Sequence, residues 1–306
     1  MTSIDGLPGY VALEALPVAS DVKPGASIQI DNSYFSIRLG ALDRINAEGR
    51  VDDRVEMVRD SYAALNRADI SVGGFDENEI HDASLDLMES YRNVPEIERI
   101  TRSFPGNSFV VPEWIRGDGY LDYGARIYFV GNDSIDEEDV LEVNIEAVVE
   151  KDRERFERYQ GEIHGYPDCC IDYFHERDDT SPERRSVEQI DLGAEQQTDP
   201  DEPTISIPDS YFEMDSSYRF FSKEFFPEPG CSEATQKGRK IYDYLDRKLP
   251  TGLVRDYFKT NYLYGRKVAE LVETKGERRP GPSKMNDTFT ELYLPLKLVS
   301  RLPRYR

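Results

Sequence analysis

The chain has 306 residues, with 60 acidic against 38 basic side chains and a formal net charge of −22. Hydrophobic residues make up 38% of the chain and aromatic residues 11%, which is enough for a folded core and excludes a disordered composition. No apolar run approaches the roughly 20 residues that span a bilayer, so we expect no membrane partner. The first residues form no secretory leader and three cysteines cannot build a disulfide framework, so we predict a cytoplasmic protein.

The charge is unevenly distributed by residue type and along the chain. Arginine (27 residues) outnumbers lysine (11), and excess acid with few lysines indicates adaptation to a salt-rich cytoplasm, where salt screens self-repulsion. Docking on a basic partner is the alternative explanation. Residues 237–306 carry 17 basic and 8 acidic side chains, a net charge of +9. This part either contacts nucleic acid or packs against the acidic remainder of its own chain, and the absence of a nucleic-acid-binding motif favours the second interpretation.

The first half of the chain is predicted to mix short strands with helices. Apolar spacing and turn residues separate the two kinds of element. Asp76 and Glu79 predict an N-cap with its capping box, and Pro95 fits the first turn of a short helix. The predicted strands are 27–30, 34–39, 108–111 and 125–130. Four helices are predicted. They cover residues 51–68, a segment that begins after Asp76, residues 96–102, and about twenty residues between 136 and 159.

The second half is predicted to be mostly helical. Residues 177–205 contain almost nothing to bury, which predicts an exposed acidic insertion. The aromatic segment 211–226 either packs in a core or docks on a protein partner, because aromatic residues dominate both environments. Helices are predicted over 231–249 and 253–273, and a proline restricts the predicted strand 292–298 to a sheet edge.

One short segment contains the residue types that carry chemistry. Residues 164–175 hold two of the three cysteines and two of the three histidines. Gly165 permits an unusual backbone turn and Pro167 favours the first turn of a helix. Cys169 and Cys170 are therefore expected in that first turn. Free backbone N–H groups and the helix dipole favour anions there, so we expect the thiols to have a lowered pKa.

The third cysteine, Cys231, follows a Pro/Gly turn at the predicted start of another helix, so two thiol-bearing helix starts could face each other across a small site. Such a site would suit zinc or an iron–sulfur cluster. The predicted ligands are Cys169, Cys170, Cys231 and His164, with Glu228 as an alternative to His164. Adjacent cysteines depart from the usual spacing of zinc-binding pairs, so a reactive thiol without metal and a purely structural cysteine cluster are alternatives.

The segment Gly165-Tyr-Pro-Asp-Cys-Cys-Ile-Asp-Tyr-Phe174 resembles the GYPxCCxxxF motif of an archaeal domain family of unknown function, number 483. In that family a proline–cysteine element follows before a helix, and residues 226–238 correspond to it here. The resemblance covers chiefly residues 160–272. The family's second element tends toward two cysteines, and this chain has Glu228 where the first would fall. The resemblance and the composition together imply a haloarchaeal cytosolic protein, and the family lends no reaction.

These features predict an α+β protein with three parts. Residues 1–135 form a mixed α+β region, residues 136–275 a mostly helical cysteine-bearing domain interrupted by residues 177–205, and residues 276–306 a basic C-terminal extension. The predicted function is binding of a metal ion or cluster. The alternative is a non-catalytic interaction or structural protein with the cysteines in its core, for which a protein partner is favoured over nucleic acid. The sequence leaves open whether the protein is an enzyme.

Overall fold

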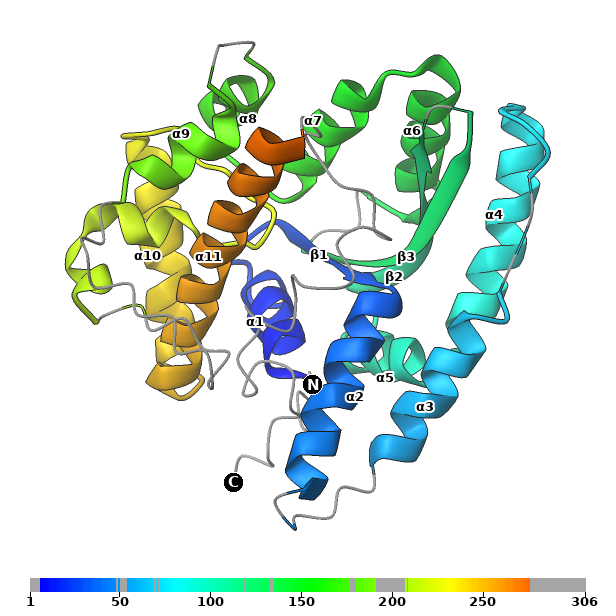
Figure 1. Cartoon of the computed structure of the whole chain (residues 1–306), viewed down its shortest axis with the longest axis horizontal. Coiled ribbons are helices and arrows are strands. Elements are labelled where there is room, and N and C mark those ends of the chain that lie inside the picture. Colours follow the sequence, from blue (N-terminus) through cyan, green and yellow to red (C-terminus); the bar gives the residue numbers. More distant parts are fainter. Residues whose placement is uncertain are drawn as a thin grey trace. The chain divides into compact units, whose positions relative to one another are not determined.

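The computed structural model of the chain describes residues 6–275 apart from 48, 50–53, 69, 71, 118, 132–134, 177–179, 191–206 and 208. Within this part the chain forms eleven α-helices and one three-stranded antiparallel sheet (Figure 1). The predicted α+β class is confirmed. None of the helices in the described ranges combines the length and the apolar character needed to cross a membrane.

The chain divides into two compact units between His164 and Gly165. Unit 1 contains α1 (Gly9–Val18), β1 (Gly25–Ile30), α2 (Asn32–Ala47), α3 (Arg54–Leu65), α4 (Glu77–Arg92), α5 (Pro95–Ser103), β2 (Ser108–Arg116), β3 (Leu121–Val130), α6 (Glu137–Glu150) and α7 (Arg153–Ile163). Unit 2 contains α8 (Asp168–His175), α9 (Pro182–Glu188), the short 3-10 helices η2 (Asp209–Glu213) and η3 (Asp215–Arg219), α10 (Ser232–Asp246) and α11 (Thr251–Lys275). The sequence places a boundary after residue 135, but α6 packs on β2 and α7 on α6, so both helices belong to unit 1.

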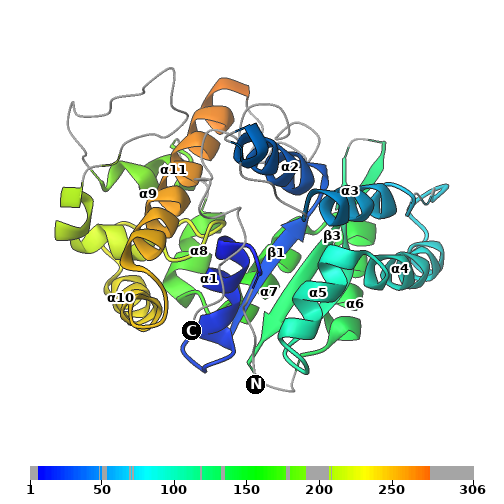
Figure 2. The same ribbon diagram turned by 90° about the horizontal axis from the view of Figure 1, so that it is seen from below.

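The sheet of unit 1 has the strand order β1-β3-β2, with both pairs antiparallel. Successive side chains of a strand point to opposite faces. The Tyr128 hydroxyl accepts a hydrogen bond from Gln160 of α7 at 2.8 Å, on one face. Phe129, its neighbour, packs edge-on against Phe104 at the end of α5, on the other face. Helices therefore cover both faces, and Figure 2 shows the sheet between α5 and α7.

Most predicted elements of unit 1 are confirmed, including the strands at β1, β2 and β3 and the helices at α3, α4 and α5. Asp76 caps α4 by accepting the Glu79 N–H at 3.0 Å. The Glu79 carboxylate, however, accepts from the Gly73 N–H at 2.8 Å. The predicted capping box is therefore only half formed, because its second carboxylate serves the preceding turn.

Two predictions in unit 1 are wrong. Residues 34–39 are not a strand but part of α2, where Asp31 accepts the Tyr34 N–H at 2.9 Å at the helix start. The single helix predicted from 136 to 159 is two helices. Lys151 takes a left-handed backbone conformation (φ 62°) that ends α6, and Asp152 then caps α7. Residues 150–155 are all charged, so the apolar pattern is interrupted at the break, and the prediction extended the helix across this gap.

Aromatic side chains form the core of unit 2. The buried members of segment 211–226 are Tyr211, Phe220, Phe221, Phe225 and Phe226. Their burial confirms core packing for these side chains and removes them as a docking surface. Part of the predicted acidic insertion also packs, because α9 buries Glu183 and Val187. Residues 191–206, the predicted strand 292–298 and the basic extension 276–306 lie outside the described residues.

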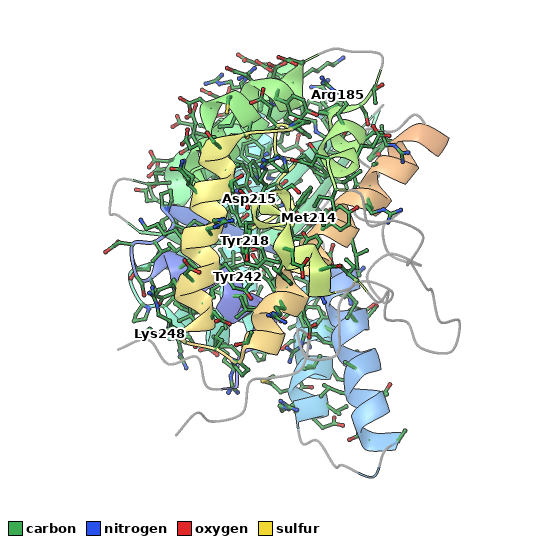
Figure 3. The ribbon with its side chains drawn as sticks, turned by 90° about the vertical axis from the view of Figure 1, so that its left-hand side faces the viewer. Arg185, Met214, Asp215, Tyr218, Tyr242 and Lys248 are labelled. Atoms are coloured by element: carbon green, nitrogen blue, oxygen red, sulfur yellow. The ribbon has the colours of Figure 1, made fainter. Side chains whose placement is uncertain are left out.

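Basic side chains of α10 and α11 contact aromatic and acidic groups of their own unit. The Arg239 guanidinium lies 5.0 Å from the ring centre of Tyr218 and forms an ion pair with Asp215. Arg255 and Lys259 lie 5.6 and 5.9 Å from the ring centre of Phe212. Figure 3 shows Asp215 and Tyr218 beside α10, with Tyr242 on that helix. These cations therefore serve internal cation–π contacts.

Candidate metal centre

The first thiol-bearing segment has the predicted turn and helix start, with Pro167 at the N-cap and not in the first turn where it was expected. Gly165 has a φ of 66°, in the left-handed region that glycine tolerates. Pro167 is the N-cap of α8, and its carbonyl oxygen accepts the Cys170 N–H at 2.8 Å. Cys169 and Cys170 therefore occupy the first turn of α8, with Cys169 exposed and Cys170 buried.

The second thiol-bearing segment is the start of α10. Cys231 is the N-cap residue, and its Sγ accepts the Ala234 N–H at 3.3 Å, the role that a serine or aspartate oxygen usually takes. Gly230, with a φ of 83°, makes the turn before it. The sequence interpretation of a helix start after a Pro/Gly turn is confirmed here too.

The two helix starts bring the three sulfur atoms together. Each Sγ of Cys169, Cys170 and Cys231 lies within 4.8 Å of the other two. The Cys169 and Cys231 sulfurs are 3.4 Å apart although the residues are 62 positions apart in the sequence. The Glu228 backbone N–H donates to the Cys170 Sγ, also at 3.4 Å. All three cysteines are free thiols.

The electrostatic prediction for these thiols is wrong. Burial raises the pKa of Cys169 to about 11, helped by hydrogen bonds to Cys231 and to the Glu228 side chain. Burial also raises the pKa of Cys170, with the neighbouring thiols adding to the effect and the Glu228 N–H opposing it. Loss of water and the proximity of other acidic groups raise the pKa of both thiols, opposite to the direction expected from the helix start alone. In the metal-free protein these two thiols are neutral at pH 7.

Aromatic pairs hold the two segments against each other. The Tyr166 ring stacks on Phe225 with centroids 4.3 Å apart, and Phe174 stacks on Phe226 at 5.7 Å. Lys237 of α10 reaches back to donate to the Gly165 carbonyl oxygen at 3.0 Å. Since residues on both sides of each cysteine are fixed in this way, the sulfur positions follow from the packing of unit 2.

The fourth predicted ligand, His164, lies in unit 1. It ends α7, is buried, and its ring stacks over Tyr128 with centroids 6.4 Å apart. Within the described ranges, the group of potential ligands at this centre contains the three cysteines alone. A role for His164 as a metal ligand therefore stays a prediction.

Two contacts of the sulfurs were missed by sequence reasoning, namely the N–H groups of Glu228 and Ala234. The second could have been inferred, because a residue before a helix commonly accepts from the N–H three positions later. The first depends on the path of the loop before α10 and has no sequence signal.

Comparison of the chain with family models, curated proteins and solved structures finds no match. The resemblance of residues 165–174 to the motif of the archaeal family therefore stays a prediction. The three clustered cysteines could hold a metal ion on their own geometry.

Proposed function

We propose that the protein binds one zinc ion through Cys169, Cys170 and Cys231. The observation that carries this proposal is the convergence of the three sulfur atoms within 4.8 Å, from two segments far apart in the sequence. Thiolate sulfur is a preferred ligand of zinc, and three protein ligands are the minimum found in its well-defined sites. The function is metal binding, whether or not a reaction accompanies it.

The sulfur separations favour one ion over an iron–sulfur cluster. A Zn–S bond of about 2.3 Å with tetrahedral angles places two thiolates about 3.8 Å apart. The separations here, which run from 3.4 Å upward and stay within 4.8 Å, bracket that value. Among three thiolates of a cluster at least two bind different iron atoms, and those two lie farther apart. An iron–sulfur cluster is the less favoured occupant.

Hydrogen-bond donors surround the sulfur atoms. Backbone N–H groups of Glu228 and Ala234 point at two of the three sulfurs, and such donors stabilise the negative charge of a metal-bound thiolate. An ion at this position would join the start of α8 to the start of α10. We infer that its main effect is to stabilise unit 2, as structural zinc does in small domains.

The deciding experiment is metal analysis of the full chain purified without oxygen in molar salt. We expect one zinc per chain, no colour, and loss of zinc in Cys170→Ser and in Cys231→Ser. Ser232→Ala, beside the cap and exposed, is the matched control and should keep its zinc. A metal-free protein whose cysteine variants keep full stability would overturn the proposal and establish the cysteines as core residues.

The wider setting is also a proposal. Three free thiols suit the reducing cytoplasm, and the acidic, arginine-rich composition suits a salt-rich one. We therefore place the protein in the cytoplasm of a halophilic archaeon, in line with the resemblance of its motif. A pull-down in high salt that recovers a stoichiometric partner would support the competing function, a non-catalytic interaction protein.

A further inference from the structure

Two of the three sulfur atoms of the candidate centre are in contact with each other. The Sγ atoms of Cys169 and Cys231 are 3.4 Å apart. A disulfide bond is about 2.05 Å long, so a shift of about 1.4 Å, shared between two side chains, would join them. The third sulfur, of Cys170, lies within 4.8 Å of both.

The three thiols differ in their access to solvent. Cys169 is exposed, whereas Cys231 is 8% and Cys170 1% exposed. A small oxidant dissolved in water therefore reaches Cys169 first, with the Cys231 sulfur in contact with it. Cys170 is next to Cys169 in the sequence, but consecutive residues of a helix do not face each other. The geometry therefore favours a pair made from two different segments.

The packing of unit 2 holds both segments beside the pair. Tyr166, in the turn before α8, stacks on Phe225 at 4.3 Å between ring centroids. Lys237 of α10 donates to the Gly165 carbonyl oxygen at 3.0 Å. Two groups that are held beside each other react at a high effective concentration, because little conformational freedom remains to be lost.

We propose that Cys169 and Cys231 form a reversible disulfide when the protein meets hydrogen peroxide. The Cys169 sulfur attacks one peroxide oxygen and the O–O bond breaks, which gives a sulfenic acid and one water molecule. The Cys231 sulfur then attacks the Cys169 sulfur, the S–S bond forms, the S–O bond breaks, and the hydroxide leaves with the Cys231 proton as a second water. The two sulfurs together lose two electrons, and the peroxide gains them. A dithiol reverses the reaction by thiol–disulfide exchange.

The disulfide does not depend on the zinc proposal, but it would compete with zinc. Both use Cys169 and Cys231, and zinc binds thiolates, which a disulfide no longer offers. Oxidation would therefore release a bound zinc ion, and bound zinc would protect the two thiols. In either state a link would join the start of α8 to the start of α10.

The reaction is expected to be slow. Burial raises the pKa of Cys169 to about 11, so little of the reactive thiolate is present at pH 7. The disulfide would then respond to sustained oxidation, and the experiment measures the end point of the reaction instead of its rate.

Peroxide oxidation of the full chain, stripped of metal by a chelator, tests the pair. We expect the free thiols to fall from three to one per chain without dimer formation, and to return to three with dithiothreitol. Trypsin cleaves after lysine and arginine, so Cys169 and Cys231 fall on separate peptides, residues 159–177 and 224–237. Mass spectrometry should find these two peptides linked after oxidation.

Single substitutions identify the partners. Cys170→Ser should keep the cross-link, whereas Cys169→Ser and Cys231→Ser should lose it. In Cys231→Ser the oxidised Cys169 should remain a sulfenic acid, which dimedone labels. Ser232→Ala, at the exposed residue beside Cys231, is the matched control and should form the cross-link like the unmodified chain.

Two measurements on the unmodified chain keep the test independent of how the variants fold. Fragmentation of the linked peptides between Cys169 and Cys170 shows which of the two carries the bond. The chain oxidised in urea provides the comparison, because unfolding removes the contact between the sulfurs. There the two cysteines should be linked to Cys231 to similar extents, whereas in the folded chain Cys169 should dominate.

The outcomes separate this inference from the proposed function. Three retained thiols, loss of thiols without the cross-link, or a cross-link mainly through Cys170 would overturn the inference and leave zinc binding untouched. A cross-link in a chain that binds no zinc when reduced would support the inference and overturn the proposed function. If both hold, excess zinc added before the peroxide should preserve all three thiols, and equal oxidation with and without zinc would refute the competition.

Discussion

The two units differ in the polar clusters that they hold. In unit 1, Arg38 is paired with Glu96 at 3.2 Å, with each side chain 1% exposed, and the Tyr34 hydroxyl donates to the same carboxylate at 2.7 Å. Lys23 and Glu14 form a second buried pair at 3.1 Å. In unit 2 the polar cluster of interest consists of like groups, three thiols within 4.8 Å of one another, of which Cys170 and Cys231 are buried and accept from backbone N–H groups.

The difference indicates which unit the proposed zinc ion would act on. A buried charge is tolerated when an opposite charge and hydrogen bonds accompany it, and unit 1 carries both members of its pairs in the chain. In unit 2 burial raises the pKa of the Cys169 and Cys170 thiols, so under the zinc proposal these two become anions when a cation joins them. Unit 1 should therefore be indifferent to metal and unit 2 responsive to it.

The largest expected effect is the pH dependence of zinc binding. Burial raises the pKa of Cys169 to about 11 and also raises that of Cys170, so zinc must displace at least two protons near neutral pH. Apparent affinity should then fall about 100-fold for each pH unit lost, or about 5 kcal/mol from pH 8 to pH 6. Competition with a chelator of known pH dependence measures it. A flat profile would mean that the ligands are not these thiols.

The metal-free protein should show the opposite dependence. A thiol whose pKa is raised by folding contributes stability that is complete below the pKa of an unfolded cysteine. That contribution is lost as the pH rises through the value in the folded state. Urea unfolding at pH 7, 9 and 10.5 should show stability that declines with pH without zinc. With zinc the thiolates are held by the metal, so stability should decline toward acid.

The next effect is confined to unit 1. Glu96→Gln leaves the Arg38 charge buried without its ion-pair partner and should cost about 3–5 kcal/mol of unfolding free energy. Glu98→Gln, on the same helix, breaks an exposed pair with Arg102 and should cost less than about 1 kcal/mol. Urea denaturation measures both, and zinc affinity should be unchanged in both. Equal costs would show that the Arg38–Glu96 pair adds nothing to unit 1.

Zinc itself should distinguish the units. At a free concentration 100 times the Kd, a ligand that binds only the folded state stabilises it by about 2.7 kcal/mol. Hydrogen exchange with and without zinc should show slower exchange of the amides in α8 and α10, while α4 and α6 stay unchanged. Equal protection of both units would contradict the comparison, because it would mean that metal acts on the whole chain.

Sequence reasoning located the site because its signals are local. Gly165 and Pro167 fix the turn before α8, and the Pro/Gly turn before Cys231 fixes the start of α10. The sequence does not show that the two segments meet. Their contact depends on stacked aromatic pairs such as Tyr166 with Phe225. Composition alone assigns such aromatics to a core without saying which rings pair.

The two wrong predictions, the strand at 34–39 and the lowered thiol pKa, both failed because the outcome depends on contacts distant in the sequence. The helical residues 34–39 have an apolar pattern that suits a strand as well, and their position in α2 is decided by packing in unit 1. The raised pKa of Cys169 comes first from burial and then from neighbours 62 and 59 positions away, Cys231 and Glu228. A helix-start argument includes only the local field, and so it predicted the wrong direction.

The smallest expected effect comes from Gly238, where α10 lies against η3. A Cβ at this position would overlap the backbone carbonyl oxygen of Tyr218, which cannot turn away as a side chain could. Gly238→Ala should therefore cost about 1–3 kcal/mol of unfolding free energy. Because Cys231 is the N-cap of α10, the same shift should weaken zinc binding.

Gly74→Ala in unit 1 is the control. It has open space around its Cβ, so its unfolding free energy and zinc affinity should match those of the unmodified chain. If Gly238→Ala lost stability but kept full zinc affinity, the sulfur positions would not depend on the packing of α10, and the link between the core of unit 2 and its metal centre would be broken.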